Sequence, residues 1–450
     1  MPWHETAPGR YERPFDTLEH LYRGLAVSAA HLQKQHYLVS SAIKVKSPLS
    51  PTDLRHAWIS LRHKHPHMAA TPDDTGLNFV YTVPSPEALD AWVQESFIVY
   101  SDNDTRSVEL LDIDLMSDQF TLHYLPHSRH LVFRAPHWRT DGRGMMLLQH
   151  EFCTLLAANP PPPILFDGSE TSRLPPPLDE VANLSTKITP ESNHSALAEL
   201  SVLFSGAPLA SFQETLPNTT PAKSHQVRIK LPQVLTKRII ATSKARNQTV
   251  TVIAHAALVT ASRPHVTPVD GRLICFNPFD LRDRLPVPWN GTAGSATVYH
   301  TGKPCSIDLV QNPDFNAVAD HLSAFYKQDL TPLFSFLVDY VQKISAILTA
   351  PLEATIQGPG AAHPELSSLG VIDNYLQKRY TSDGNREGNT GVVELEDWWL
   401  GVQNMNRELQ MHVWMWDGDI YLACQYNAAF YERGFVEGFL EEWRGVFEGL

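Results

Sequence analysis

The segment Pro136-His137-Trp138-Arg139-Thr140-Asp141-Gly142 holds the side chains in this chain that are best suited to chemistry. The pKa of a histidine lies near neutrality, so an imidazole such as that of His137 can take a proton from a substrate and later return it. Asp141 directly precedes Gly142, which predicts a tight turn that directs the carboxylate back into the protein. The spacing alone leaves two interpretations open, a catalytic histidine and a structural histidine at the end of a strand.

Alternating strands and helices are predicted on both sides of this loop from apolar periodicity, caps and breakers. In the first half they are a strand over 37–46, a helix from Ser50-Pro51 to Lys64 or His65, strands over 118–125 and 130–135, and a buried helix from Met145 to Leu156. In the second half they are a strand over 225–231, helices over 232–246 and 249–262, a strand over 272–278, largely helical structure over 315–350, a strand over 392–396, a hairpin over 411–426 and a C-terminal helix from Tyr431.

A shift in composition divides the chain. The stretch 161–224 is rich in Pro, Ser, Thr and Asn, and Pro160 to Pro163 stand at its start, so we interpret it as a crossover linker with one helix over 195–204. A chain of 450 residues predicts two domains or lobes, at roughly 100–200 residues per domain. We therefore expect an N-terminal lobe over 1–160 and a C-terminal lobe over 225–450.

The totals exclude several classes of function. A net charge of −13 argues against a general nucleic-acid binder. The four cysteines are scattered without a CxxC pair, which argues against a zinc site, and we expect no metal. The N-terminus has no secretion signal and no run of about 20 apolar residues occurs, so we expect a cytoplasmic protein without a membrane span.

Two further motifs follow in the second half of the chain. Asn277 precedes an Asp280-x-Arg282-x-Arg284 core at the end of a predicted strand, and Ser367-Ser368-Leu369-Gly370 is interpreted as a turn. Together with the His137 loop, the helix that contains Leu54 to Trp58 and the helix over 249–258, these motifs resemble the chloramphenicol-acetyltransferase-like superfamily. This superfamily includes the BAHD plant acyltransferases and the condensation domains of peptide synthetases. The resemblance covers most of the chain and points to the fungal trichothecene O-acetyltransferase branch.

The resemblance implies an α/β fold with two lobes, each a mixed β-sheet with helices, and an active-site channel between them. His137 would be the general base. Asp141 would be structural and would form a salt bridge with an arginine from the second lobe, Arg282 as first choice and Arg284 as second. Candidates for stabilising the oxyanion are the Gly142 amide, Asn277 and Ser368, and the last two also fit a purely structural role.

The implied activity is acyl transfer from acyl-CoA, above all acetyl-CoA, to a hydroxyl of a fungal secondary metabolite, by a monomer that needs no bound cofactor. Two alternatives remain open: a donor on an acyl carrier protein, and a protein on the same fold that binds or cyclises a metabolite without acyl transfer. Pro136 replaces the first histidine of condensation domains, and the Asp-Phe-Gly-Trp-Gly motif of the plant branch is absent. A basic cluster could meet CoA phosphates or form a solvated helix face, and it consists of Lys237, Arg238, Lys244 and Arg246.

Overall fold

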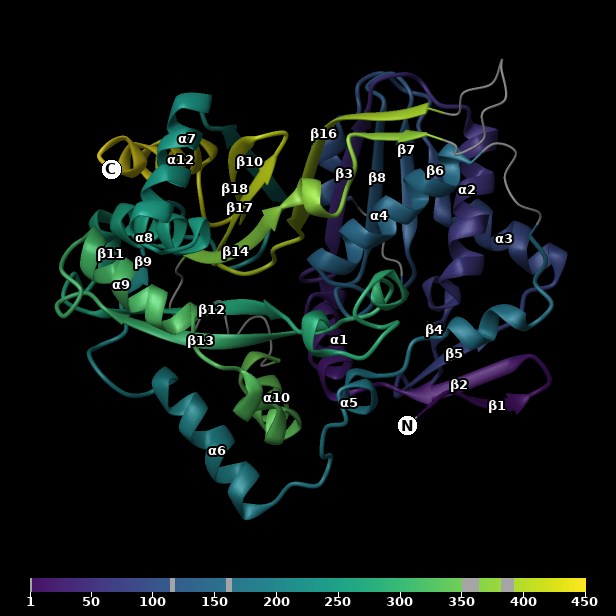
Figure 1. Cartoon of the computed structure of the whole chain (residues 1–450), viewed down its shortest axis with the longest axis horizontal. Coiled ribbons are helices and arrows are strands. Elements are labelled where there is room, and N and C mark those ends of the chain that lie inside the picture. Colours follow the sequence, from purple (N-terminus) through teal and green to yellow (C-terminus); the bar gives the residue numbers. More distant parts are fainter. Residues whose placement is uncertain (1, 114–117, 159–163, 350–363, 382–391) are drawn as a thin grey trace. The chain divides into compact units, whose positions relative to one another are not determined.

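Two larger β-sheets, each with helices packed against it, dominate the computed structural model, which describes residues 2–113, 118–158, 164–349, 364–381 and 392–450 (Figure 1). By its internal contacts the chain divides into two units. Unit 1 consists of Met1–Leu184, Asp280–His300 and Asp373–Val402, and unit 2 of Ser185–Phe279, Thr301–Ile372 and Gln403–Leu450. Unit 1 therefore includes two segments that the linear division assigned to the C-terminal lobe. The predicted boundary at 160 and the prolines Pro160 to Pro163 lie outside the described residues.

The larger sheet of unit 1 has six strands. In spatial order they are β15 (Arg379–Thr381), β16 (Val392–Val402), β3 (Val39–Val45), β8 (His130–Ala135), β7 (Thr121–Leu125) and β6 (Phe97–Val99). Strand β8 is antiparallel to both of its neighbours, whereas β6 and β7 are parallel, so the sheet is mixed. Five successive residues of β8, from Leu131 to Ala135, are buried, which means that both faces of this strand are covered.

Helices α2 (Pro51–Lys64) and α4 (Gly142–Ala157) lie side by side against this sheet (Figure 1). Pro51 occupies the first turn of α2, where its missing N–H is harmless. The buried ring of Trp58 in α2 contacts Phe133 of β8 and Phe152 of α4. Burying an apolar side chain of this size contributes about 2–3 kcal/mol, so these contacts fix the helices on the strand that leads to His137.

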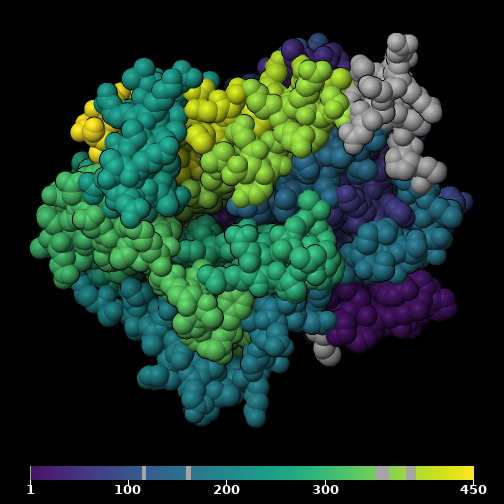
Figure 2. Space-filling model, in the orientation of Figure 1, coloured from purple at the N-terminus to yellow at the C-terminus, as the bar shows by residue number. Residues whose placement is uncertain are grey.

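A smaller sheet and three further helices of unit 1 were not predicted. The sheet contains β1 (His4–Ala7), β2 (Arg10–Pro14), β5 (Asn78–Thr82) and β4 (Thr71–Pro72), and the helices are α1 (Thr17–Ser28), α3 (Pro86–Ser96) and α5 (Leu178–Val181). The hairpin of β1 and β2, coloured purple, lies at the surface in Figure 2. Short strands with few apolar residues carry little periodicity, which explains why the sequence did not reveal them.

The larger sheet of unit 2 has four strands, in the order β10 (Ser224–Lys230), β18 (Asp419–Asn427), β17 (Leu409–Trp416) and β14 (Pro364–Val371). Strands β14 and β17 are parallel and the other pairs antiparallel, so this sheet is also mixed. Helices α7 (Gln233–Ala245), α8 (Val250–Ser262) and α12 (Arg433–Glu448) pack against it (Figure 1). The other elements are α6 (Pro190–Leu200), β9 (Ser211–Phe212), β11 (Val266–Thr267), β12 (Arg272–Asp280), β13 (His300–Asp308), α9 (Phe315–Tyr326) and α10 (Leu337–Leu348).

The predicted α/β class with mixed sheets is confirmed, and three local predictions are corrected. Helix α4 begins at Gly142 rather than Met145, because Asp141 caps it in place of forming a tight turn. Ser367 to Gly370 lie in strand β14, which is irregular beside Gly370 at φ +75°, and do not form a turn. The helix predicted over 195–204 is α6, which begins earlier because Thr189 caps it. No helix in the described part of the chain is long and apolar enough to cross a membrane.

Candidate active site

Strand β8 determines where His137 lies. The strand is held on both sides by β3 and β7 and ends at Ala135, and His137 follows in a turn. The His137 side chain is partly exposed, and its Nδ1 is buried without a hydrogen-bond partner among the residues that the structure describes. The ring is therefore not tied down by a hydrogen bond at Nδ1 within the described residues.

The two residues after His137 anchor the loop in the core of unit 1. The Trp138 ring packs against Phe15 and Phe79 in an aromatic cluster. The buried Arg139 guanidinium donates hydrogen bonds to the carbonyl oxygens of His67 and Ala70. Because the packing of Trp138 and the hydrogen bonds of Arg139 hold the backbone here, the Cα of the neighbouring His137 has a fixed position.

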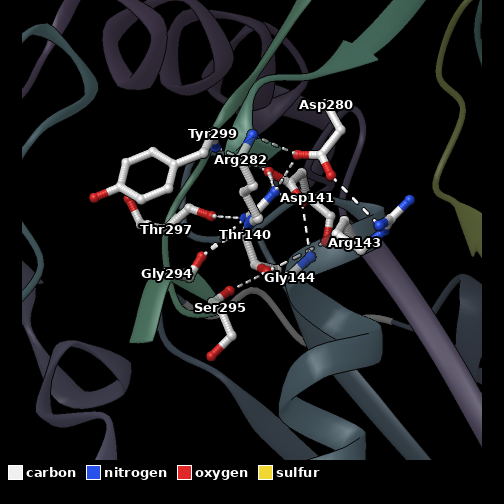
Figure 3. Close-up of polar contacts among 10 residues, drawn as sticks. All are labelled: Thr140, Asp141, Arg143, Gly144, Asp280, Arg282, Gly294, Ser295, Thr297 and Tyr299. Atoms are coloured by element: carbon white, nitrogen blue, oxygen red, sulfur yellow. Dashed lines mark hydrogen bonds and ion pairs between the residues drawn. The ribbon is translucent and has the colours of Figure 1, made fainter. Parts of the chain in front are cut away.

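Asp141 cannot act as a free base, because donors surround its carboxylate (Figure 3). Its Oδ1 accepts a hydrogen bond from the Gly144 amide at 2.8 Å, which caps α4, and its Oδ2 accepts one from the Tyr299 amide at 2.9 Å. The Arg282 Nη1 lies 2.9 Å from both carboxylate oxygens. Burial alone would raise the pKa of Asp141, but the Arg282 guanidinium, the His300 ring and the two amides lower it to about 2.

Arg282, the first-choice partner, lies in a single helical turn directly after β12 and is buried. Its Nη1 also donates to Asp280 at 3.1 Å, while Nη2 donates to the Gly294 carbonyl at 2.8 Å and the Thr297 carbonyl at 3.3 Å, and Nε donates to the Gly294 carbonyl at 3.3 Å (Figure 3). Arg284 is exposed and is not the partner of Asp141. Breaking a buried, well-paired ion pair destabilises a protein by about 3–5 kcal/mol, so this pair is a strong constraint on the loop.

A second contact ties the loop to the same segment. The Thr140 hydroxyl donates a hydrogen bond to the Ser295 carbonyl oxygen at 2.9 Å. A Cβ on Gly144 would collide with that Ser295 oxygen and would lie 2.6 Å from the Thr140 Oγ1. Gly144, drawn beside Ser295 in Figure 3, is therefore required by this close approach.

Both members of the ion pair belong to unit 1, although they stand far apart in the sequence. The resemblance implied an arginine from the second lobe. By contacts, the segment Asp280–His300 that carries Arg282 belongs with the first 184 residues. The pair therefore stabilises the interior of one unit.

Two residues that the sequence analysis missed flank the His137 ring. The Tyr22 ring of α1 stacks on it, with centroids 4.0 Å apart and planes 5° apart. The His300 ring, at the start of β13, lies 5.4 Å from His137 and 5.3 Å from Tyr22 between centroids. Burial and the neighbouring His300 lower the pKa of His137 to about 3, against a smaller opposite effect of Asp141. The imidazole is therefore neutral, and able to accept a proton, at neutral pH.

The other predicted site residues in the second half lie in unit 2. The Asn277 Nδ2 donates to the Cys275 carbonyl, and its Oδ1 accepts from the Tyr326 hydroxyl. The Ser368 hydroxyl is hydrogen-bonded to Thr251 at 2.8 Å. These contacts fit the structural interpretation of both residues, and their role toward an oxyanion stays a prediction, as does that of the Gly142 amide.

The basic cluster of α7 and its C-terminal end offers little free charge. Arg238 donates to the Glu448 carbonyl oxygen at 2.8 Å, and Arg246 donates to the Asn316 side chain at 2.7 Å. These contacts favour a solvated helix face over a phosphate site. Within the described residues, no group of three or more His, Cys, Asp and Glu side chains is arranged to hold a metal ion.

Comparisons with known proteins show what the chain is similar to. No family model matches the chain. Acetyltransferase pigO of Monascus ruber is 27% identical over 453 residues, which cover 96% of this chain and 94% of that protein. O-acetyltransferase pigM of the same fungus is 24% identical over 480 residues, which cover 100% of this chain and 87% of that protein.

The structure of the trichothecene 15-O-acetyltransferase TRI3 from Fusarium sporotrichioides matches with a TM-score of 0.81 over 99% of this chain and 97% of that chain, at 17% identity. The whole two-lobed fold is thus shared. The resemblance stated from the motifs is confirmed: the chain has the fold of this trichothecene acetyltransferase and is similar over its full length to two proteins named acetyltransferases, which supports an acyltransferase.

Proposed function

We propose that this acyltransferase moves an acetyl group from acetyl-CoA to a hydroxyl of a fungal secondary metabolite, with His137 as general base. The names of pigO and pigM support acetyl transfer, and the TRI3 match supports the fold on which it takes place. One observation carries the proposal: within a single loop Asp141 is fully engaged by Arg282 and two amides, while the His137 ring is partly exposed and its Nδ1 has no hydrogen-bond partner among the described residues.

The proposed reaction needs one imidazole. His137 Nε2 takes the proton of the acceptor hydroxyl while the oxygen attacks the carbonyl carbon of the thioester, which forms a C–O bond and an oxyanion. The tetrahedral intermediate collapses, the C–S bond breaks, and the imidazolium returns its proton to the departing thiolate. The products are an ester and free CoA thiol.

Cysteine chemistry has no place in this scheme. All four cysteines are buried, and burial raises the pKa of the Cys153 and Cys424 thiols above the ordinary value. A nucleophilic cysteine is exposed to its substrate and has a lowered pKa. An acyl-enzyme on cysteine is therefore not part of the proposal.

The test is incubation of the protein with acetyl-CoA and a panel of hydroxylated acceptors, with a thiol reagent for CoA release and mass spectrometry for the acetylated product. We expect His137→Ala to lower turnover by about 10³-fold, within the range for loss of a general acid–base group, without changing the melting temperature. His127→Ala is the matched control, because His127 is exposed on the turn before β8.

Full activity of a folded His137→Ala variant would contradict the proposed base. Transfer from an acyl carrier protein but not from acetyl-CoA would keep the base and change the donor. Absence of acetylated product with every acceptor and both donors would contradict the proposed function.

A further inference from the structure

The face-to-face stack of Tyr22 on His137 restricts the candidate base. Parallel rings at 4.0 Å are in van der Waals contact over their whole faces. Rotation of the imidazole about its Cβ–Cγ bond would drive it into the tyrosine ring. The stack therefore fixes the plane of the His137 ring.

The N-terminus of α1 explains why Tyr22 is held so firmly. Asp16 and Glu19 form a capping box, in which each side chain accepts a hydrogen bond from the backbone amide of the other at 2.8 Å. Arg13 donates both Nη groups to the Glu19 carboxylate at 2.7 Å, and both side chains are fully buried. Tyr22 lies one helical turn after Glu19, so the contacts that hold the start of α1 also hold the backbone that carries the Tyr22 ring.

His300 owes its place to the clamp on Asp141. The Tyr299 amide donates to Asp141 Oδ2, and His300 is the next residue. The same hydrogen bond that engages the aspartate thus brings a second imidazole beside His137. Among the described residues, the rings of Tyr22 from α1 and His300 from β13 contact the His137 ring, and Asp141 of the same loop acts on it through its charge.

We propose that Tyr22 and His300 are positioning residues for the His137 imidazole: Tyr22 fixes the plane of the ring, and His300 opposes its protonation before the acceptor binds. The role in turnover rests on the proposed function, whereas the positioning itself is a property of the folded chain. A base that is misplaced by about 1 Å loses on the order of 10²-fold in rate, so fixing the ring plane has a direct kinetic consequence. The neighbouring His300 lowers the pKa of His137, and the Asp141 charge has a smaller, opposite effect.

The experiment combines kinetics with NMR of protein labelled with ¹³C-histidine, in which His137→Ala assigns the His137 resonance. Tyr22→Leu removes the stack and Tyr22→Phe keeps it. Tyr11→Leu is the matched control, because Tyr11 packs against the same hydrophobic cluster as Tyr22. We expect Tyr22→Leu to shift the His137 resonance and to lower kcat about tenfold with little change in KM, and Tyr22→Phe and Tyr11→Leu to do neither.

His300→Gln tests the second half of the proposal. We expect the titration midpoint of His137 and the acid limb of kcat/KM to move to higher pH. The role of Tyr22 would be overturned if folded Tyr22→Leu left the His137 resonance and kcat unchanged, or if Tyr11→Leu had equal effects. The role of His300 would be overturned if His300→Gln left the titration midpoint of His137 unmoved. Should Tyr22→Leu not fold, Tyr22→Met takes its place. If the wild-type protein transfers no acyl group, the proposed function fails, yet the NMR comparison still decides the positioning.

Discussion

Two buried ion pairs of unit 1 hold two different elements beside the His137 ring. The pair of Arg282 and Asp141 holds the loop that carries the histidine, and the pair of Arg13 and Glu19 holds the helix that stacks on it. The first joins residues far apart in the sequence, whereas the second joins residues six positions apart. One pair therefore depends on the assembled fold of unit 1, and the other is local.

The charge around the two arginines also differs. Arg282 faces two carboxylates, Asp141 and Asp280, and the pKa of Asp141 falls to about 2. At the other pair, burial and the negative charges of Glu19 and Asp179 raise the pKa of Asp16 well above its ordinary value. The pair of Asp141 and Arg282 therefore stays charged at all pH values well above 2, whereas several carboxyl groups lie close together at the N-terminus of α1. The comparison predicts that neutralising Asp141 lowers stability and activity more than neutralising Glu19 does.

The largest effect is expected from Asp141→Asn. It leaves Arg282 buried with only the partly exposed Asp280 as a charged partner, so we expect a loss of about 3 kcal/mol in the free energy of unfolding. Because the His137 loop loses its clamp, kcat should also fall by about 10²-fold. Urea denaturation and thiol release measure the two effects, and Asp283→Asn, an exposed carboxylate in the same turn, is the control. A stable, fully active Asp141→Asn variant would refute the clamp.

Glu19→Gln should have a smaller effect. Arg13 keeps a hydrogen bond to the Pro14 carbonyl, and removal of the Glu19 charge takes away one of the causes that raise the pKa of Asp16, so we expect a loss of about 2 kcal/mol in stability. Activity should fall about tenfold, through the displaced Tyr22 ring. The same urea and thiol assays apply. A fall in kcat as large as that of Asp141→Asn would show that the two pairs do not act on different parts of the site.

The asymmetry between the two pairs also explains what the sequence could predict. The His137 loop and Arg282 belong to motifs whose spacing can be read in the sequence, so the resemblance identified them. The strands before the loop could be predicted as well. The capping-box pattern Asp16-x-x-Glu19 is a local signal in the sequence from which the start of α1 could have been predicted.

No spacing reveals that Tyr22 and His300 meet at His137, because their contact depends on how α1 and β13 pack. The requirement for glycine at position 144 could not be predicted for a similar reason, because it depends on the approach of Ser295 from a distant segment. Asn277 and Ser368 matched motif positions, yet their side chains are hydrogen-bonded within unit 2, Asn277 to Cys275 and Tyr326 and Ser368 to Thr251.

Gly144→Ala tests the approach of the two segments at the loop pair. A Cβ there meets the Ser295 carbonyl, so the backbone must shift, at a cost of about 1–3 kcal/mol in stability. The same substitution at Gly438 of α12 meets nothing within 4 Å and should stabilise by about 0.5–1 kcal/mol. Melting curves of both variants check the prediction, and equal shifts of one sign would contradict it.

The smallest expected effect concerns pH. Because folding lowers the pKa of His137 to about 3, the unfolded chain binds a proton below about pH 6.5 that the folded chain does not. The stability linked to this group is present above pH 6.5 and is lost as the pH falls toward 3. Between pH 7.5 and 5.5 the wild-type protein should lose about 1 kcal/mol more than His137→Ala does in urea denaturation. Identical losses would show that His137 is not held neutral by folding.

Chemical rescue tests the central claim most directly, because it separates a missing base from a misplaced one. Imidazole added to folded His137→Ala should restore thiol release in proportion to the concentration of neutral imidazole, and it should not restore Asp141→Asn, in which the histidine is still present. Rescue of neither variant, or equal rescue of both, would contradict the account of His137 as the base and Asp141 as its support.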